Sequence, residues 1–163
     1  KGELFVKENA TRYIICRAGW MMGGGPMKDK KFINKLMKKI KNGEKELFIV
    51  DDKDGTPTYT YDFANNVKLL IESECWGLYN MVCGGYTSRL EVATELIKNI
   101  GMESTIKIIP VGSEFFKDEY FAERPPSERL INSKLDLMGM NIMRDWRKTI
   151  KEYISKSYSE YVK

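Results

Sequence analysis

The stretch YIICRAGWMMGGGPMKDKKFINKLMKKIKNGEKELFIV, residues 13–50, decides the fold class. It opens with an apolar, β-branched run at 13–20, which predicts a buried strand. A loop rich in Gly and Pro follows at 21–28, and apolar residues then recur at helical spacing. Asn42-Gly43 is a typical helix stop, and the apolar run at 45–50 predicts a second strand. Strand, helix and strand in this order indicate an α/β domain.

The same alternation continues to the end of the chain. Further strands are predicted at 77–85 and 104–111, and helices at 61–74, 89–101 and 144–162. Ser88 and Glu91 have the spacing of a capping box at the start of one of these helices. The chain has 163 residues, which suits one compact domain, and no clear linker divides it. We therefore expect residues 1–163 to form a single unit. Its first residues read as the back end of a helix, which indicates a piece of a longer polypeptide.

Charge and hydropathy limit the classes of partner. The 27 basic and 23 acidic residues leave a net charge of +4, which describes a mildly basic, solvated surface. The Lys-rich segment 28–45 has apolar residues at helical spacing, so it predicts an amphipathic helix with a solvated Lys face. Aromatic residues are not interleaved on that face, and we expect no nucleic-acid partner. No apolar run approaches the ~18 residues of a membrane span, and the start is not a signal peptide.

The residue types also limit the chemistry. The three cysteines, Cys16, Cys75 and Cys83, form no CxxC motif, and the chain contains no His. This pattern argues against a disulfide framework and against a Cys/His metal site, so we expect no bound metal. It fits a reducing compartment, and we expect the cytoplasm. Without His, acid/base catalysis would require Asp, Glu, Lys, Tyr or Cys.

The Gly run 23–25 follows the carboxyl end of the first predicted strand. Its spacing matches neither a phosphate-binding P-loop nor a dinucleotide fingerprint. Open α/β sheets nevertheless bind ligands at this end of their strands, so the run is either a plain loop or a pocket wall. Trp20, at the same place, is either a core residue or a flat platform for a ring or sugar.

The acidic stretch DDKDGTPT, residues 51–58, does not have the ligand spacing of an EF-hand calcium loop. Its Asp54-Gly55 pair instead predicts a tight turn, followed by the entry to the next helix. This stretch therefore carries no metal prediction.

The segment ERPPSERL, residues 123–130, places two arginines beside a pair of prolines. Proline fixes the backbone and so presents the neighbouring Arg124 and Arg129 in a defined direction. A rigidly held guanidinium suits bidentate pairing with phosphate oxygens, although a surface salt bridge is an equal alternative.

Taken together, these stretches resemble the carboxyl half of the dTDP-4-dehydrorhamnose reductases. These are extended short-chain dehydrogenase/reductases that act on nucleotide-linked sugars. The resemblance rests on RAGWMMGGG and KKF within 17–32, VDDKDGTPTYTYDFA at 50–64, GLYNMVCGGYTSRLEVA at 77–93, ERPPSERLINSKL at 123–135 and DWRKTIKEY at 145–153. It implies the carboxyl-terminal part of a Rossmann-type α/β fold without the amino-terminal nucleotide-binding half.

The resemblance also implies what the chain does. Gly2-Glu3 resembles the dipeptide that follows the catalytic Tyr-x-x-x-Lys pair of the family. No catalytic residue would then lie in this chain, which alone would be inactive. It would be the nucleotide-sugar-binding half of an NAD(P)H-dependent 4-keto-sugar reductase, with NADP or NAD bound mainly by the upstream half. The expected substrate-binding residues are Trp20, Phe32, Thr56, Thr58 and Arg124, and those beside the nicotinamide are Ala18 and Gly19.

Two alternatives stay open within the same family. One is a catalytically silent subunit that regulates or binds a partner enzyme, and the other is an epimerase or dehydratase acting on a nucleotide sugar. In either case the expected partner is a nucleotide-diphosphate sugar. A homodimer is also expected as a way to cover the edge of the strand at 13–17.

Overall fold

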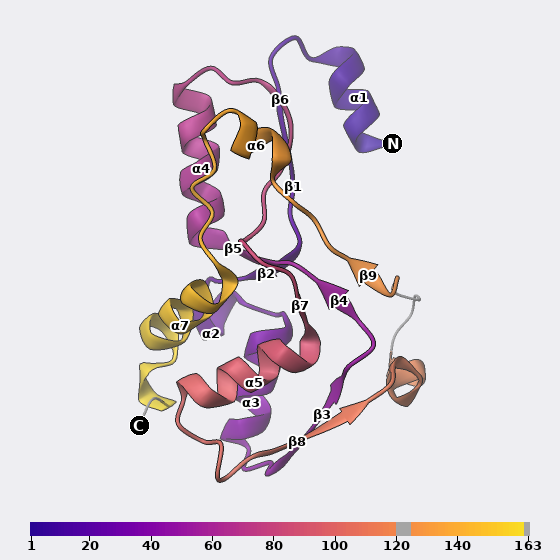
Figure 1. Cartoon of the computed structure of the whole chain (residues 1–163), viewed down its shortest axis with the longest axis vertical. Helices are drawn as coiled ribbons and strands as arrows, with labels where there is room; N and C mark the ends of the chain where they lie inside the picture. The colour runs from indigo at the N-terminus through magenta and orange to yellow at the C-terminus, as the bar shows by residue number, and fades with distance from the viewer. Residues whose placement is uncertain (120–124, 162–163) are drawn as a thin grey trace.

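The computed structural model describes residues 1–119 and 125–161. Helices α1, α4 and α6 lie at one end of the molecule with strands β1 and β6, and α2, α3, α5 and α7 gather at the other end (Figure 1). The helices are α1 (Gly2–Asn9), α2 (Gly25–Lys28), α3 (Phe32–Lys41), α4 (Thr60–Glu72), α5 (Arg89–Asn99), α6 (Ser133–Leu137) and α7 (Trp146–Ser157), with short 3₁₀ turns η1 (Ser113–Glu119) and η2 (Ser159–Tyr161).

The described strands form short, mostly parallel groups. They are β1 (Ile14–Arg17), β2 (Trp20–Met22), β3 (Glu46–Val50), β4 (Asp54–Gly55), β5 (Pro57–Tyr59), β6 (Gly77–Asn80), β7 (Thr87–Ser88), β8 (Lys107–Val111) and β9 (Ser127–Glu128). Parallel pairs join β1 to β6, β2 to β5 and β3 to β8, while β4 lies between β7 and β9. Parallel strands connected through helices confirm the α/β class.

The strand predicted at 13–20 is divided in two. β1 pairs with β6 as far as Arg17, and β2 pairs with β5 from Trp20 onward. Between them the chain changes its partner strand at Gly19, whose backbone passes directly against Thr56. A Cβ added at Gly19 would lie 2.0 Å from the carbonyl oxygen of Thr56, so only glycine permits this approach.

The turn predicted at Asp54-Gly55 is wrong. These residues form β4, which is antiparallel to β7 and parallel to β9. The amide of Asp54 donates to the carbonyl oxygen of Pro126 at 2.9 Å, and the guanidinium of Arg129 pairs with the Asp54 carboxylate. A dipeptide with strong turn propensity is therefore extended because segments distant in the sequence supply its partners.

Helices α3, α5 and α7 enclose the main core. Their buried positions follow helical spacing, which confirms the predicted amphipathic helices and the solvated Lys face of α3. The capping box of α5 is also confirmed, since the Ser88 side chain accepts from the amide of Glu91 and the Glu91 side chain accepts from that of Ser88. The least exposed side chains include Leu47, Leu70, Leu96, Ile100, Leu135, Trp146 and Ile150.

Candidate functional site

Trp20 begins β2 and is held from three sides. Its amide donates to the carbonyl oxygen of Thr56 at 2.9 Å, and its indole Nε1 donates to Glu128 Oε2 at 2.8 Å. The ring packs so closely on Gly55 that an added Cβ there would lie 2.3 Å from the indole. The indole is half-buried, so this aromatic side chain has a fixed orientation and still reaches the surface.

Phe32 and Trp20 both contact the side chain of Arg89. The guanidinium carbon of Arg89 is 3.8 Å from the ring centroid of Trp20 and 4.9 Å from that of Phe32. Both distances are typical of cation–π contacts, which reach to ~6 Å. The structure thus brings together two of the predicted site residues and adds Arg89 and Glu128. Sequence reasoning missed both, because the start of a helix and a two-residue strand carry no local sign of contact with Trp20.

Thr56 and Thr58 are buried, and their hydroxyls bind backbone groups. Thr56 Oγ1 accepts from the amide of Leu130 at 3.1 Å. Thr58 Oγ1 accepts from the amide of Gly19 at 2.9 Å and donates to the carbonyl oxygen of Met81 at 3.4 Å. These contacts hold the junction between β1 and β2 in place. Contact of either hydroxyl with a ligand stays a prediction.

The remaining candidates are Ala18 and Gly19 beside the nicotinamide and the two arginines near the prolines. Ala18 and Gly19 form the half-buried junction before Trp20, and their contact with a nicotinamide stays a prediction. Arg124 lies outside the described residues, and its role stays a prediction. Arg129, the other arginine beside the prolines, makes a surface ion pair with Asp54 and lies 4.1 Å from the ring centroid of Tyr86. The salt-bridge interpretation of Arg129 is therefore confirmed.

The Gly run lines a cavity as well as turning the chain. Gly23, Gly24 and Gly25 have φ values of +140°, +86° and +67°, which side chains rarely adopt. A Cβ on Gly23 would also lie 1.8 Å from Thr60 Oγ1. The adjoining cavity of about 340 Å³ is lined by Gly24, Gly25, Tyr59, Thr60, Tyr61, Tyr153, Lys156 and Ser157. Gly24 and Gly25 border this open hollow, and a role of the run as the wall of a ligand pocket stays a prediction.

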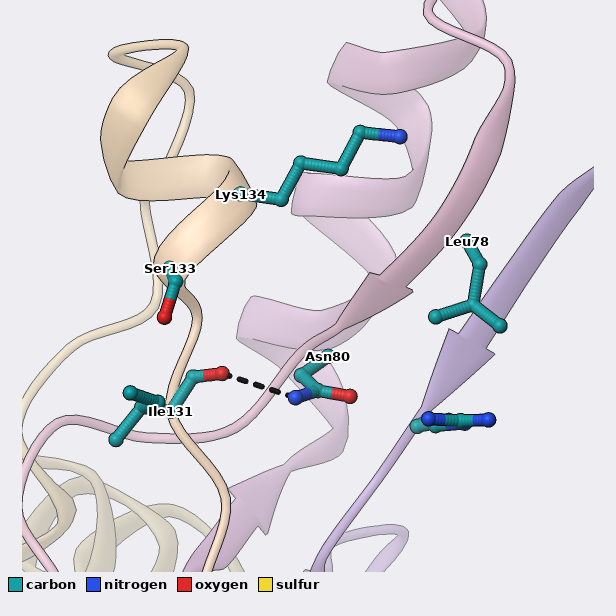
Figure 2. A pocket seen from close by; sticks show the side chains of 6 residues that line it. Leu78, Asn80, Ile131, Ser133 and Lys134 are labelled. Atoms are coloured by element: carbon teal, nitrogen blue, oxygen red, sulfur yellow. Dashed lines mark hydrogen bonds between the residues drawn. The ribbon is translucent and has the colours of Figure 1, made fainter.

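A second cavity of about 210 Å³ lies beside β6 (Figure 2). Arg17 of β1 and Asn80 of β6 are register partners on its wall. Asn80 Nδ2 donates to the carbonyl oxygen of Ile131 at 3.1 Å, and its buried Oδ1 has no hydrogen-bond partner among the described residues. Arg17 pairs with Glu3 of α1 at 2.6 Å. The contact anchors an otherwise exposed helix to the strand.

A chain of charges joins α4 to α7. The Arg144 guanidinium binds the buried carboxylate of Asp62 at 2.6 Å and Glu152 at 2.5 Å, and Lys156 binds Glu152 at 2.8 Å. Hydrogen bonds from Arg144, and then from Lys156, lower the pKa of Glu152 to about 2. The same carboxylates raise the pKa of Arg144. This network fixes the loop before α7 to the start of α4.

Glu152 is expected to make stability depend on pH in acid. Its pKa is lower in the folded chain than its ordinary value of 4.5, so its contribution is complete above that value and is lost as pH falls toward about 2. We expect the difference in unfolding free energy between the wild type and Glu152→Gln to be large near about pH 6 and clearly smaller near about pH 3. Urea unfolding of both proteins at the two pH values measures this free-energy difference. A difference that does not change with pH would contradict the lowered pKa of Glu152.

The described residues also bear on metal sites and on membrane-spanning helices. Within 1–119 and 125–161, no group of three or more Cys, Asp and Glu side chains is arranged to hold a metal ion. No helix in the same part of the chain is long and apolar enough to cross a membrane.

Comparison with protein families gives one match over almost the whole chain. Residues 1–159 match the model described as the RmlD substrate binding domain. The spore coat polysaccharide biosynthesis protein SpsK of Bacillus subtilis is 28% identical over 158 residues, which are 97% of this chain and 52% of that protein. The dTDP-4-dehydrorhamnose reductase of Mycolicibacterium smegmatis is 24% identical over 94% of this chain and 46% of its own length.

Solved structures agree with this family. A dTDP-4-dehydrorhamnose reductase from Clostridium acetobutylicum is 33% identical with a TM-score of 0.84, and the match covers 95% of this chain and 52% of that one. The Bacillus anthracis enzyme in complex with NADP is 27% identical with a TM-score of 0.85 over the same shares. The chain therefore spans about half the length of these relatives, and its α/β fold matches their carboxyl-terminal half. The chain belongs to the RmlD substrate-binding domain family.

Proposed function

We propose that this chain is the nucleotide-sugar-binding part of an NAD(P)H-dependent 4-keto-sugar reductase, with a dTDP-4-dehydrorhamnose-type substrate. The family match supports the substrate class. The observation that carries the assignment to particular residues is the fixed, half-buried indole of Trp20, with Phe32 beside it. A rigid aromatic side chain at the start of a parallel strand suits a sugar ring, because the part of the indole that Gly55 and Arg89 leave exposed is an apolar surface that loses no conformational entropy on binding.

The cofactor belongs to this proposal as well. Ala18 and Gly19 are small and half-buried, which fits close packing of a flat nicotinamide ring against their backbone. These two residues would line the ring, and the bound cofactor would supply a hydride to the sugar carbonyl. Thr58 holds Gly19 through its amide, so the junction keeps its shape when a ligand is present.

Proton transfer and charge neutralisation are divided between this chain and the part that the family places upstream. By resemblance, an upstream Tyr protonates the carbonyl oxygen, and a neighbouring Lys lowers its pKa. The chain alone is therefore proposed to be inactive. Arg124 is proposed to neutralise the diphosphate, because a guanidinium pairs with phosphate oxygens in a bidentate manner. The cytoplasmic location and the homodimer also stay predictions.

Trp20→Ala is expected to weaken the affinity for dTDP-glucose about tenfold, which corresponds to ~1.4 kcal/mol. The affinity for dTDP alone should change little, because the indole is proposed to face the sugar. Calorimetric titration of the full-length protein measures both affinities, and circular dichroism checks the fold. Trp76→Ala is the matched control, since that indole is 36% exposed and lies beside β6, outside the proposed site. An unfolded Trp20→Ala protein, or an equal loss for both ligands, would contradict the platform role.

A further inference from the structure

Arg89 connects the two aromatic residues that the proposed function assigns to the sugar nucleotide. It is the first residue of α5, whereas Trp20 begins β2 and Phe32 begins α3. Its guanidinium carbon lies 3.8 Å from one ring centroid and 4.9 Å from the other. One side chain thus contacts two rings that come from segments far apart in the sequence.

Different contacts hold the Nε1 edge of the Trp20 indole and limit the tilt of its ring plane. The hydrogen bond to Glu128 holds the Nε1 edge at 2.8 Å, and Gly55 leaves no space on the side where the ring packs against β4. The Arg89 guanidinium lies over the ring at stacking distance. A guanidinium is planar and stacks on aromatic faces, whereas the ammonium of lysine is a compact, strongly hydrated charge. The shape of Arg89, as well as its charge, therefore sets the tilt of the indole.

The backbone of Arg89 is also held in place. Ser88 caps α5 through its capping box with Glu91, and the amide of Arg89 donates to the carbonyl oxygen of Lys53 at 3.4 Å. Lys53 immediately precedes β4, which carries Gly55. Arg89, which lies over Trp20, and Gly55, which packs against the same indole, are thus linked through the short backbone segment from Lys53 to Gly55.

We propose that Arg89 is a positioning residue for the sugar nucleotide. Its guanidinium lies over the Trp20 indole and within cation–π distance of Phe32, and it holds the indole so that the remaining exposed part of that ring meets the sugar. This assignment rests on the proposed function for the identity of the ligand, while the stack itself is a property of the chain. Because Arg89 acts through Trp20, its effect on affinity depends on the presence of the indole.

The stack is tested without any ligand by nuclear magnetic resonance of the ¹⁵N-labelled full-length protein. The indole Nε1–H signal of Trp20, identified by its absence in Trp20→Phe, should shift in both Arg89→Ala and Arg89→Lys. The indole signals of Trp76 and Trp146 should not move. Arg147→Ala is the matched control, because Arg147 lies 4.4 Å from the ring centroid of Trp146, and it should shift that signal alone. An unchanged Trp20 signal in both Arg89 variants would overturn the proposal.

The consequence for binding is tested by a double-mutant cycle with dTDP-glucose. Arg89→Ala and Arg89→Lys should each weaken binding about five- to tenfold in the wild-type background, on the scale of a partly desolvated cation–π contact. In the Trp20→Ala background, Arg89→Ala should change affinity less than about twofold. Equal losses in both backgrounds, or full rescue by Lys, would overturn the proposal. If the wild type does not bind dTDP-glucose, the proposed function fails, and the Trp20 signal still decides whether Arg89 holds the ring.

Discussion

Arg144→Ala is expected to destabilise the protein by about 2–3 kcal/mol, because it leaves the buried carboxylate of Asp62 without its guanidinium partner, which is itself 40% exposed. Asp62 is 4% exposed, and Arg144 binds it through the amide, Nε and Nη2. Removal of the guanidinium leaves a carboxylate with little access to water and few donors. Glu152 loses its Arg144 contact at the same time. Urea denaturation, followed by circular dichroism, measures the loss of unfolding free energy.

Two further variants make this prediction specific. Lys156→Ala removes an exposed partner of the same network and should cost little stability, because exposed ion pairs are screened by solvent. Asp62→Leu combined with Arg144→Leu should recover much of the lost stability, because neither charge then stays unpaired. A loss in Arg144→Ala no larger than that in Lys156→Ala would show that the pair does not hold α4 to α7.

Gly19→Ala is expected to destabilise the protein by about 1–3 kcal/mol, the cost of overpacking, and to weaken sugar binding as well. The added Cβ would lie 2.0 Å from the Thr56 carbonyl oxygen and 3.3 Å from a methyl carbon of Val82. The first of these neighbours is backbone, so the clash is relieved only if β2 moves away from β5. That movement would lengthen the hydrogen bond from the Trp20 amide to Thr56 and turn the indole away from its present position.

The matched control is Gly2→Ala, which introduces the same methyl group at a position with no heavy atom within 4 Å. We expect it to leave both the unfolding free energy and the affinity for dTDP-glucose unchanged. The Gly19→Ala protein should show a lower denaturation midpoint and an altered Trp20 indole signal. A variant that keeps the wild-type midpoint and the wild-type Trp20 signal would show that the junction tolerates a side chain.

Both predictions bear on the same structural question, namely what keeps the proposed sugar platform rigid. The Asp62–Arg144–Glu152 network fixes α4 and α7 beneath β5, and Gly19 permits β2 to approach that strand closely. Trp20 begins β2, so its position depends on both. A pre-organised platform binds with a smaller entropic cost than a mobile one. The stability of these contacts is therefore expected to appear in the affinity as well as in the unfolding free energy.

The helices were the part of the fold that sequence reasoning predicted best. The approximate positions of α3, α4 and α5, the capping box at Ser88 and the buried stripe of α7 all follow from local spacing, whereas α2 lies in the stretch that was predicted as a loop. Helical hydrogen bonds join residues four apart, so the signals that start and stop a helix lie within the same segment. The strands β3 and β8 were also predicted, although not their pairing, because each is rich in apolar residues.

The site was predicted less completely, for a physical reason. The sequence indicated Trp20, Phe32, Thr56, Thr58 and Arg124 only through the family that its motifs resemble. The partners of the Trp20 indole, Arg89 and Glu128, come from α5 and β9, and no local pattern connects these to Trp20. A cation–π contact or an indole hydrogen bond between distant segments depends on how the segments pack. Such a contact between two individual side chains leaves no periodic pattern in the sequence.

By itself, then, the sequence determined the α/β class, the approximate positions of the long helices, the family and the aromatic residue proposed to meet the sugar. Only the tertiary structure decided that Asp54-Gly55 is a strand rather than a turn and that the run at 13–20 is two strands with different partners. It also decided that Arg89 lies over Trp20. Helix formation is governed by neighbours along the chain, whereas strand pairing and side-chain stacking are governed by neighbours in space.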